Sequence, residues 1–158
     1  MAQMTGKQFI ETFFIAQVEQ VISTIPYMAF IIMGIGIEFL GKCLHSKDIM
    51  DDSRSRIRFE EAIVNLKSFS TYIPLIGKNN KFDLYSSLRC GLVHSAAPKY
   101  SITLSSKTEG PHLEQDAKGE RINLRCEDFY SDFRKACEEV IQMPDPVATK
   151  LAQPFLEV

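Results

Sequence analysis

Apolar residues recur at helical spacing over most of this 158-residue chain. Pro26 fits the first turn of the second such segment, which is apolar nearly all round as far as Ile37, as in the central helix of a bundle. Asp83 precedes the fourth segment and can cap it or place negative charge at its start. The pattern predicts helices at 9–22, 26–44, 56–69, 84–95 and around 129–140.

A change of period follows the fourth predicted helix. Residues 100–105 and 121–125 alternate apolar and polar side chains, which is the pattern of a β-strand with one buried face. We expect these strands to form the two arms of a β-hairpin. The joining segment, 107–120, contains Gly110, Pro111 and Gly119 and is longer than a usual hairpin loop, so we expect it to be mobile.

The expected fold is therefore mainly α: an antiparallel helical bundle of about five helices, with a small β-hairpin before the last long helix. No internal repeat or linker divides the chain, so 1–158 is expected to be a single domain. In the tail, 145–158, Val147, Leu151 and Phe155 are spaced four residues apart. That spacing suits a short helix docked on this domain or on a partner.

Charge and cysteine content narrow the function classes. The net charge of −2 and the pI near 5.9 argue against a dedicated nucleic-acid coat protein, although they leave room for a local basic site. The four cysteines are far apart and form no C-x-x-C pair, so neither a zinc knuckle nor a redox motif is indicated. We expect reduced thiols in a cytoplasmic protein.

The uncharged stretch 20–37 is just long enough to span a membrane. Ser23, Thr24 and Pro26 interrupt it, and no Lys or Arg lies nearby to set an orientation. We therefore expect a buried core helix and no association with a membrane; a membrane-associated helical protein is a third alternative. The N-terminus lacks the pattern of a secretory signal.

The fourth predicted helix, 84–95, carries the residues best suited to catalysis or ligand binding. At roughly 100° per residue, Leu84, Leu88, Leu92 and Gly91 form one stripe, while Arg89 and His94 lie on the other side, roughly 140° apart. The small or weakly apolar residues between Arg89 and His94 on this second face are Ser86, Cys90 and Val93. A face of this kind is typical of a contact surface and not of a merely solvated one.

This helix resembles the motif helix of the HEPN superfamily. Arg89, four intervening residues and His94 match the R-x(4–6)-H motif, and "LRCGLVH" is similar to that family's "LRNGLVH"-type helix. The preceding "GIEFLGKCL" and the later hairpin and final helix are also similar to some bacterial HEPN-like proteins. The resemblance is sharp over about a dozen residues of the chain.

The resemblance implies a helical bundle that forms a homodimer, in which two motif helices share one cleft. Active family members are metal-independent ribonucleases, so the implied substrate is RNA and no metal or cofactor is expected. On this hypothesis His94 is the acid/base and Arg89 binds the phosphate charge that develops in the transition state. Ser86, Cys90 and Val93 would line the substrate-binding or dimer cleft.

Architectural alternatives remain open for each of these residues. His94 can offset the helix dipole and bond a last-turn carbonyl, and Arg89 can form an ion pair with a carboxylate such as Glu38. Cys90 stands where active members usually carry a polar residue. A catalytically silent module that dimerises and binds RNA or a partner protein is therefore the main alternative to an enzyme.

Other candidate residues have weaker support. His45 and His112 are expected at the surface rather than in a metal site. The sequence contains no HExxH, no P-loop and no G-x-S-x-G motif, so zinc hydrolysis, nucleotide triphosphate cleavage and serine-elbow chemistry lack local support.

Overall fold

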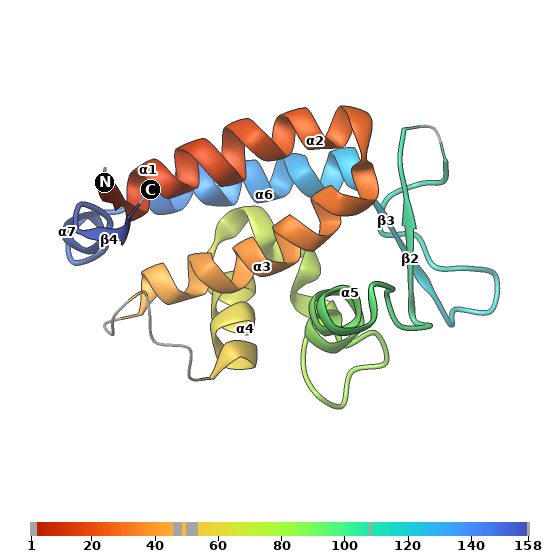
Figure 1. Cartoon of the computed structure of the whole chain (residues 1–158). Coiled ribbons are helices and arrows are strands. Elements are labelled where there is room, and N and C mark those ends of the chain that lie inside the picture. The colour runs from red at the N-terminus through yellow and green to blue at the C-terminus, as the bar shows by residue number, and fades with distance from the viewer. Residues whose placement is uncertain (1–2, 46–48, 50–53, 108, 158) are drawn as a thin grey trace.

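The computed structural model describes residues 3–45, 49, 54–107 and 109–157, and this part of the chain is mainly helical, as predicted (Figure 1). The elements in chain order are β1 (Gln3–Thr5), α1 (Gly6–Phe9), η1 (Ile10–Gln17), α2 (Val18–Thr24), α3 (Pro26–Leu44), α4 (Ser55–Asn65), η2 (Lys67–Leu75), η3 (Tyr85–Cys90), α5 (Gly91–Ser95), β2 (Ile102–Ser105), β3 (Ile122–Arg125), α6 (Cys126–Ile141), α7 (Val147–Leu151) and β4 (Pro154–Glu157).

The first helix is continuous through α1, η1 and α2, and its middle part, η1, has π-helical hydrogen bonding. It starts at a capping box, in which the Thr5 side chain accepts from the Gln8 N–H and the Gln8 side chain accepts from the Thr5 N–H. Its buried residues are Gly6, Ile10, Phe14 and Val18, spaced four apart, so it presents one face to the core. The helix runs antiparallel to α6 and lies beside it (Figure 1).

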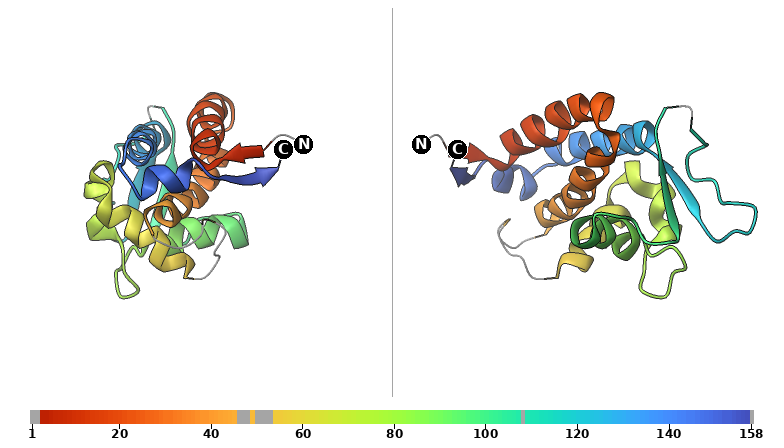
Figure 2. Two further views of the ribbon diagram at one scale, coloured as in Figure 1. Left: turned by 90° about the vertical axis from the view of Figure 1, so that its left-hand side faces the viewer. Right: turned by 45° about the vertical axis from the view of Figure 1, so that its right-hand side comes forward.

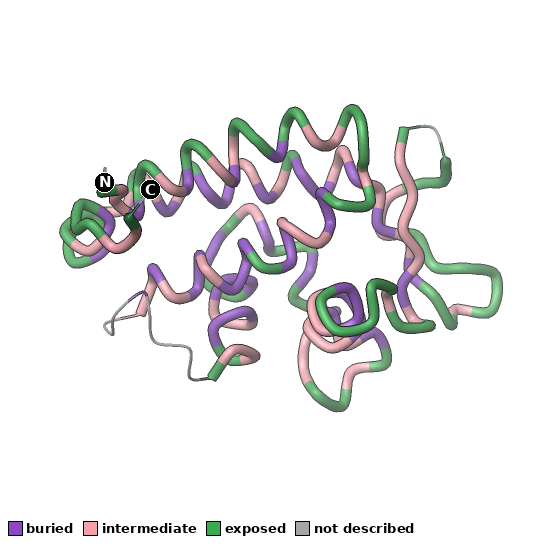
Figure 3. Tube along the Cα trace, in the orientation of Figure 1, coloured by how far each residue is buried: buried purple, intermediate pink, exposed green. Residues whose placement is uncertain are grey.

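Helix α3 lies at the centre of the fold, and Pro26 occupies its first turn as the sequence predicts. Its buried side chains include Phe30, Met33 and Ile37. In Figure 3 the buried residues follow the inward faces of α3 and α6. A Cβ at Gly36 would lie 2.5 Å from the Phe133 ring of α6, so glycine permits this close packing.

The length and composition of α3 would also suit a membrane span. The helix has 19 residues and a mean hydropathy of 1.6, and 56% of its most apolar window is buried inside the protein. The core helix of a soluble protein has the same features, so these two properties are weak evidence for a membrane span.

The third predicted helix, 56–69, is interrupted at Leu66, which has extended backbone angles. Helix α4 ends at Asn65 and a 3₁₀ helix, η2, follows. The reason lies in α6, where the Glu139 carboxylate accepts hydrogen bonds from the N–H groups of Lys67 (2.9 Å) and Ser68 (2.8 Å). A distant carboxylate therefore caps a new helix start, which local periodicity does not reveal.

The predicted β-hairpin is wrong, because β2 and β3 pair in parallel, with Ile102 opposite Ile122 and Leu104 opposite Leu124. Parallel neighbours need a crossover of a dozen residues or more, and the connection 106–121 is long enough. Antiparallel pairing occurs instead between that connection and β3, with a bridge from Gln115 to Ile122. There the Leu113 N–H donates to Asn123 O (2.7 Å), and the Asn123 N–H donates to Glu114 O (2.9 Å).

The tail docks on this domain. Val147 and Leu151 are buried in α7, the predicted short helix, whereas Phe155 lies in β4. Strand β4 pairs antiparallel with β1, which brings the two ends of the described chain together (Figure 2). The Phe155 ring lies 5.4 Å from that of Phe9, between centroids, so the tail completes an aromatic cluster against the first helix.

Candidate functional site

The predicted helix 84–95 is present as η3 followed directly by α5, and we call these two segments the motif helix. Asp83 stands at its start: the Ser87 N–H donates to Asp83 O (2.8 Å) and the Ser86 N–H to Asp83 Oδ1 (3.4 Å). Leu84, Leu88 and Leu92 are buried, as their spacing predicts. The helix ends at Ala96, whose φ of 51° is left-handed.

Arg89 faces α3, where a Cβ at Gly34 would lie 3.6 Å from the Arg89 Cα. Arg89 Nη2 lies 2.8 Å from Glu38 Oε2, and the two side chains are only 17% and 9% exposed. The ion pair considered at the sequence level is therefore present. Arg89 Nε is buried and has no hydrogen-bond partner in the described part of the chain, so one N–H of the guanidinium is unsatisfied.

Glu38 is itself held in place by a short chain of hydroxyl groups. Ser55 Oγ donates to Glu38 Oε2 (2.6 Å), and Tyr85 Oη donates to Ser55 Oγ (2.9 Å). Burial raises the pKa of Tyr85, so this phenol remains a proton donor at neutral pH. The carboxylate is therefore fixed by the motif helix and by the first residue of α4.

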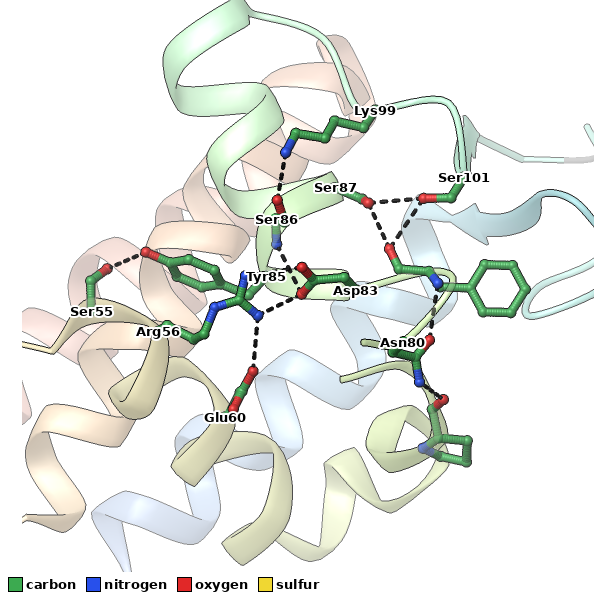
Figure 4. Close-up of polar contacts among 12 residues, drawn as sticks. Ser55, Arg56, Glu60, Asn80, Asp83, Tyr85, Ser86, Ser87, Lys99 and Ser101 are labelled. Carbon is green, nitrogen blue, oxygen red and sulfur yellow. Dashed lines mark hydrogen bonds and ion pairs between the residues drawn. The ribbon is translucent and has the colours of Figure 1, made fainter. Parts of the chain in front are cut away.

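The same region contains a second arginine that the sequence analysis did not single out. Figure 4 shows Arg56 of α4 beside the start of the motif helix, where it donates to both Asp83 oxygens (2.6 and 2.9 Å) and to Glu60 (3.1 Å). The hydrogen bond to Asp83 is the main reason that the pKa of Arg56 is raised. The guanidinium carbon atoms of Arg56 and Arg89 lie 4.6 and 5.8 Å from the Tyr85 ring centroid, which is cation–π range.

His94 differs from Arg89 because it is exposed. Its side chain makes no hydrogen bond to any described residue, so the alternative in which the ring bonds a last-turn carbonyl is not what the structure shows. Other donors bind the carbonyl groups at the end of this helix: Tyr27 Oη donates to Ala96 O (2.5 Å), and the Ala97 N–H donates to Gly91 O (3.4 Å). The imidazole is free to contact a ligand.

The remaining predicted cleft residues lie on the same helix with different surroundings. Val93 is 40% exposed, and Ser86 and Cys90 are partly buried. Ser86 Oγ accepts a hydrogen bond from Lys99 Nζ (2.5 Å), as Figure 4 shows. Within the described residues, no hydrogen bond or ion pair joins Arg89 to His94, so a single chain presents them as separate groups on one helix.

His112, expected at the surface of a mobile loop, is instead half-buried and hydrogen-bonded at both ring nitrogens. The Arg125 N–H donates to His112 Nδ1 (3.0 Å), and His112 Nε2 lies 2.9 Å from Tyr72 Oη. Tyr72 Oη also lies 2.9 Å from Asp132 Oδ2. Because Nδ1 accepts, the neutral ring carries its proton on Nε2, and Tyr72 then donates to Asp132.

The other candidates give no second site. His45 follows the end of α3 and is half-buried, with its carbonyl accepting from Lys150 Nζ (2.7 Å). All four cysteines are free thiols, and burial raises the pKa of Cys43 and of Cys126 to about 12. Within residues 3–45, 49, 54–107 and 109–157, no group of three or more His, Cys, Asp or Glu side chains is arranged to hold a metal ion.

No protein family model, no curated protein and no solved structure matches this chain.

Proposed function

We propose that this chain is a HEPN-like, metal-independent endoribonuclease or RNA-processing protein, a cytoplasmic homodimer of antiparallel helical bundles. The observation that carries the proposal is on the motif helix, where a largely buried arginine with an unsatisfied N–H lies five residues before an exposed histidine with no hydrogen bond to the described residues. An anionic ligand would satisfy the first group, and a proton donor or acceptor would engage the second.

The chemistry of these groups suits RNA cleavage without a metal. Imidazole can remove the proton from a ribose 2′-hydroxyl, whose oxygen then attacks the adjacent phosphorus. The bond from phosphorus to the 5′ oxygen breaks, and that leaving oxygen takes up a proton from an acid. The products are a 2′,3′-cyclic phosphate and a 5′-hydroxyl end. The guanidinium of Arg89 would stabilise the charge on the nonbridging oxygens during this step.

Dimerisation is supported by exposed apolar residues on the motif helix and on α3, which packs against it. Met28 and Ile35, seven residues apart on α3, are 44% and 43% exposed, and Val93 on the motif helix is 40% exposed. Burying these side chains against a second copy would remove apolar surface from water. It would also bring two copies of Arg89 and His94 into one cleft, which a single chain lacks.

A cleavage assay tests the proposed reaction. Purified wild-type protein is incubated with total cellular RNA in EDTA, beside His94→Gln and the matched variant Ser95→Ala, which alters the neighbouring exposed residue. We expect wild type and Ser95→Ala to produce cyclic phosphate ends, whereas His94→Gln loses about 100-fold or more of the rate, because glutamine cannot exchange the proton. Undiminished cleavage by folded His94→Gln would overturn the role of His94.

A catalytically silent HEPN-like module that binds RNA or a partner protein is the second candidate. Two observations favour it: the Arg89 charge is already paired with Glu38, and Cys90 replaces the polar residue usual in active relatives. This module would form a stable dimer and bind its partner, while neither wild type nor His94→Gln would cut RNA. Binding without cleavage would therefore select this function over the enzyme.

A further inference from the structure

Tyr100 is the most exposed of the large apolar side chains described, at 91%, and the next in rank, Ile25 and Val64, are only 55% exposed. An aromatic ring that remains almost wholly in water contributes little to folding. Rings of this kind are typical of binding surfaces, where they supply contact area with little loss of conformational entropy.

The backbone that carries Tyr100 is fixed to the motif helix. The Lys99 N–H donates to Ser87 O (2.9 Å), and Ser101 Oγ lies 2.8 Å from Ser87 Oγ (Figure 4). Gly91 permits this contact, since a Cβ there would lie only 2.7 Å from Ala97 O. The exposed ring therefore has a defined position relative to the helix that carries Arg89 and His94.

The chain segment that carries Tyr100 has only basic charges, which favours a polyanion as its ligand. The chain has 20 acidic residues, yet none lies between Asp83 and Glu109. That interval holds four basic or imidazole side chains, namely Arg89, His94, Lys99 and Lys107. The Lys99 ammonium lies on Ser86, which is on the same helix face as Cys90 and Val93, so it reaches the surface that carries the proposed site.

We propose that Tyr100 stacks on an unpaired base of the RNA and that Lys99 binds an adjacent phosphate. This inference rests on the proposed function and narrows its substrate to single-stranded or looped RNA, because a base inside a duplex is not free to stack on a side chain. Aromatic stacking beside a lysine is how proteins bind single strands with little sequence preference. The pair would hold the strand while the 2′-hydroxyl meets His94.

Because the chain contains no tryptophan, Tyr100→Trp introduces a single indole reporter. We would place it in the His94→Gln background to prevent cleavage and titrate it with a single-stranded RNA oligonucleotide. We expect saturable quenching of the indole fluorescence by the single strand and none by a duplex of the same sequence. The matched control is Val64→Trp on α4, whose fluorescence should not change.

Affinity measurements complete the test. In the same background, Tyr100→Ala should bind the single strand about 10-fold more weakly, whereas Tyr100→Phe should bind like the parent because it retains the ring. Lys99→Gln should reduce the slope of log affinity against log salt by about 0.7, the value for one phosphate contact on a single strand.

The outcomes separate this inference from the proposed function. If the parent binds RNA but Tyr100→Ala binds equally well and Tyr100→Trp is not quenched, the stacking site is wrong and the ribonuclease or RNA-binding function stands. Equal quenching of Val64→Trp would also overturn the stacking site. If wild type neither binds nor cuts RNA, the proposed function fails and this inference fails with it.

Discussion

Arg89 carries a permanent charge that the fold has largely removed from water. Glu38 balances that charge through one nitrogen, and the carboxylate is fixed in turn by Ser55 and Tyr85. Removing one partner of such a pair costs more than the pair contributes, because the other charge is left buried alone. The architectural role of Arg89 and its proposed role toward RNA can therefore be separated by changing the carboxylate.

Glu38→Gln should lower the free energy of unfolding by about 2–4 kcal/mol, because Arg89 then lacks a counter-charge. Replacing the arginine as well, in the double variant Glu38→Gln with Arg89→Met, should recover most of that loss, since no charge remains buried. Urea unfolding followed by circular dichroism measures both values. Glu11→Gln, in an exposed pair with Lys7, is the control and should change stability by less than about 0.5 kcal/mol. If Glu38→Gln has the same free energy of unfolding as wild type, the ion pair contributes nothing to stability.

At the scale of elements, His112 connects the crossover segment to two helices and a strand. The groups that face it are Tyr72 of η2, Arg125 of β3, and Asp128 and Asp132 of α6. Burial is the main cause that lowers the pKa of His112, and the two aspartates oppose that shift. Protonation of Nδ1 would break the hydrogen bond from the Arg125 N–H, so the pairing of the crossover with β3 depends on a neutral ring.

This arrangement predicts a dependence of stability on pH. The unfolded chain binds a proton on this histidine below about pH 6.5, whereas the folded protein binds it only at a lower pH. The contribution of His112 is therefore complete above pH 6.5 and is lost as the pH falls toward the folded pKa, by at most about 1.4 kcal/mol per pH unit. Unfolding of wild type and His112→Gln between pH 7.5 and 5.5 tests this. The stability difference should shrink as the pH falls, and a constant difference would contradict it.

For the whole molecule, the sequence predicts those features that depend on local spacing. The bounds of α3, the buried stripe of leucines on the motif helix and the docked α7 follow from apolar periodicity. Alternation identified both strands but carried no information about their relative direction, because a connection of this length permits either parallel or antiparallel pairing. The break at Leu66 depends on Glu139, which is more than seventy residues away. Arg56 had no local signal beyond its spacing from Glu60, because its main partner, Asp83, is distant in sequence.

Assembly is the property of the whole molecule on which the proposed site depends. Ile35 on α3 and Ile73 on η2 are both 43% exposed, so glutamate at either position places a charge on comparably exposed surface. If two copies pack through the face beside the motif helix, Ile35→Glu should convert a dimer to a monomer in sedimentation velocity, because the charge would be buried without a partner. Ile73→Glu should remain dimeric.

Cleavage should follow assembly, since a single chain carries only one Arg89 and one His94. Folded monomeric Ile35→Glu should cut RNA far more slowly than dimeric Ile73→Glu, with equal circular dichroism spectra as the check on folding. A monomer that cuts at the wild-type rate would show that one motif helix is sufficient and would remove the need for a shared cleft. A persistent Ile35→Glu dimer would place the interface on another face, and the two motif helices would then act apart.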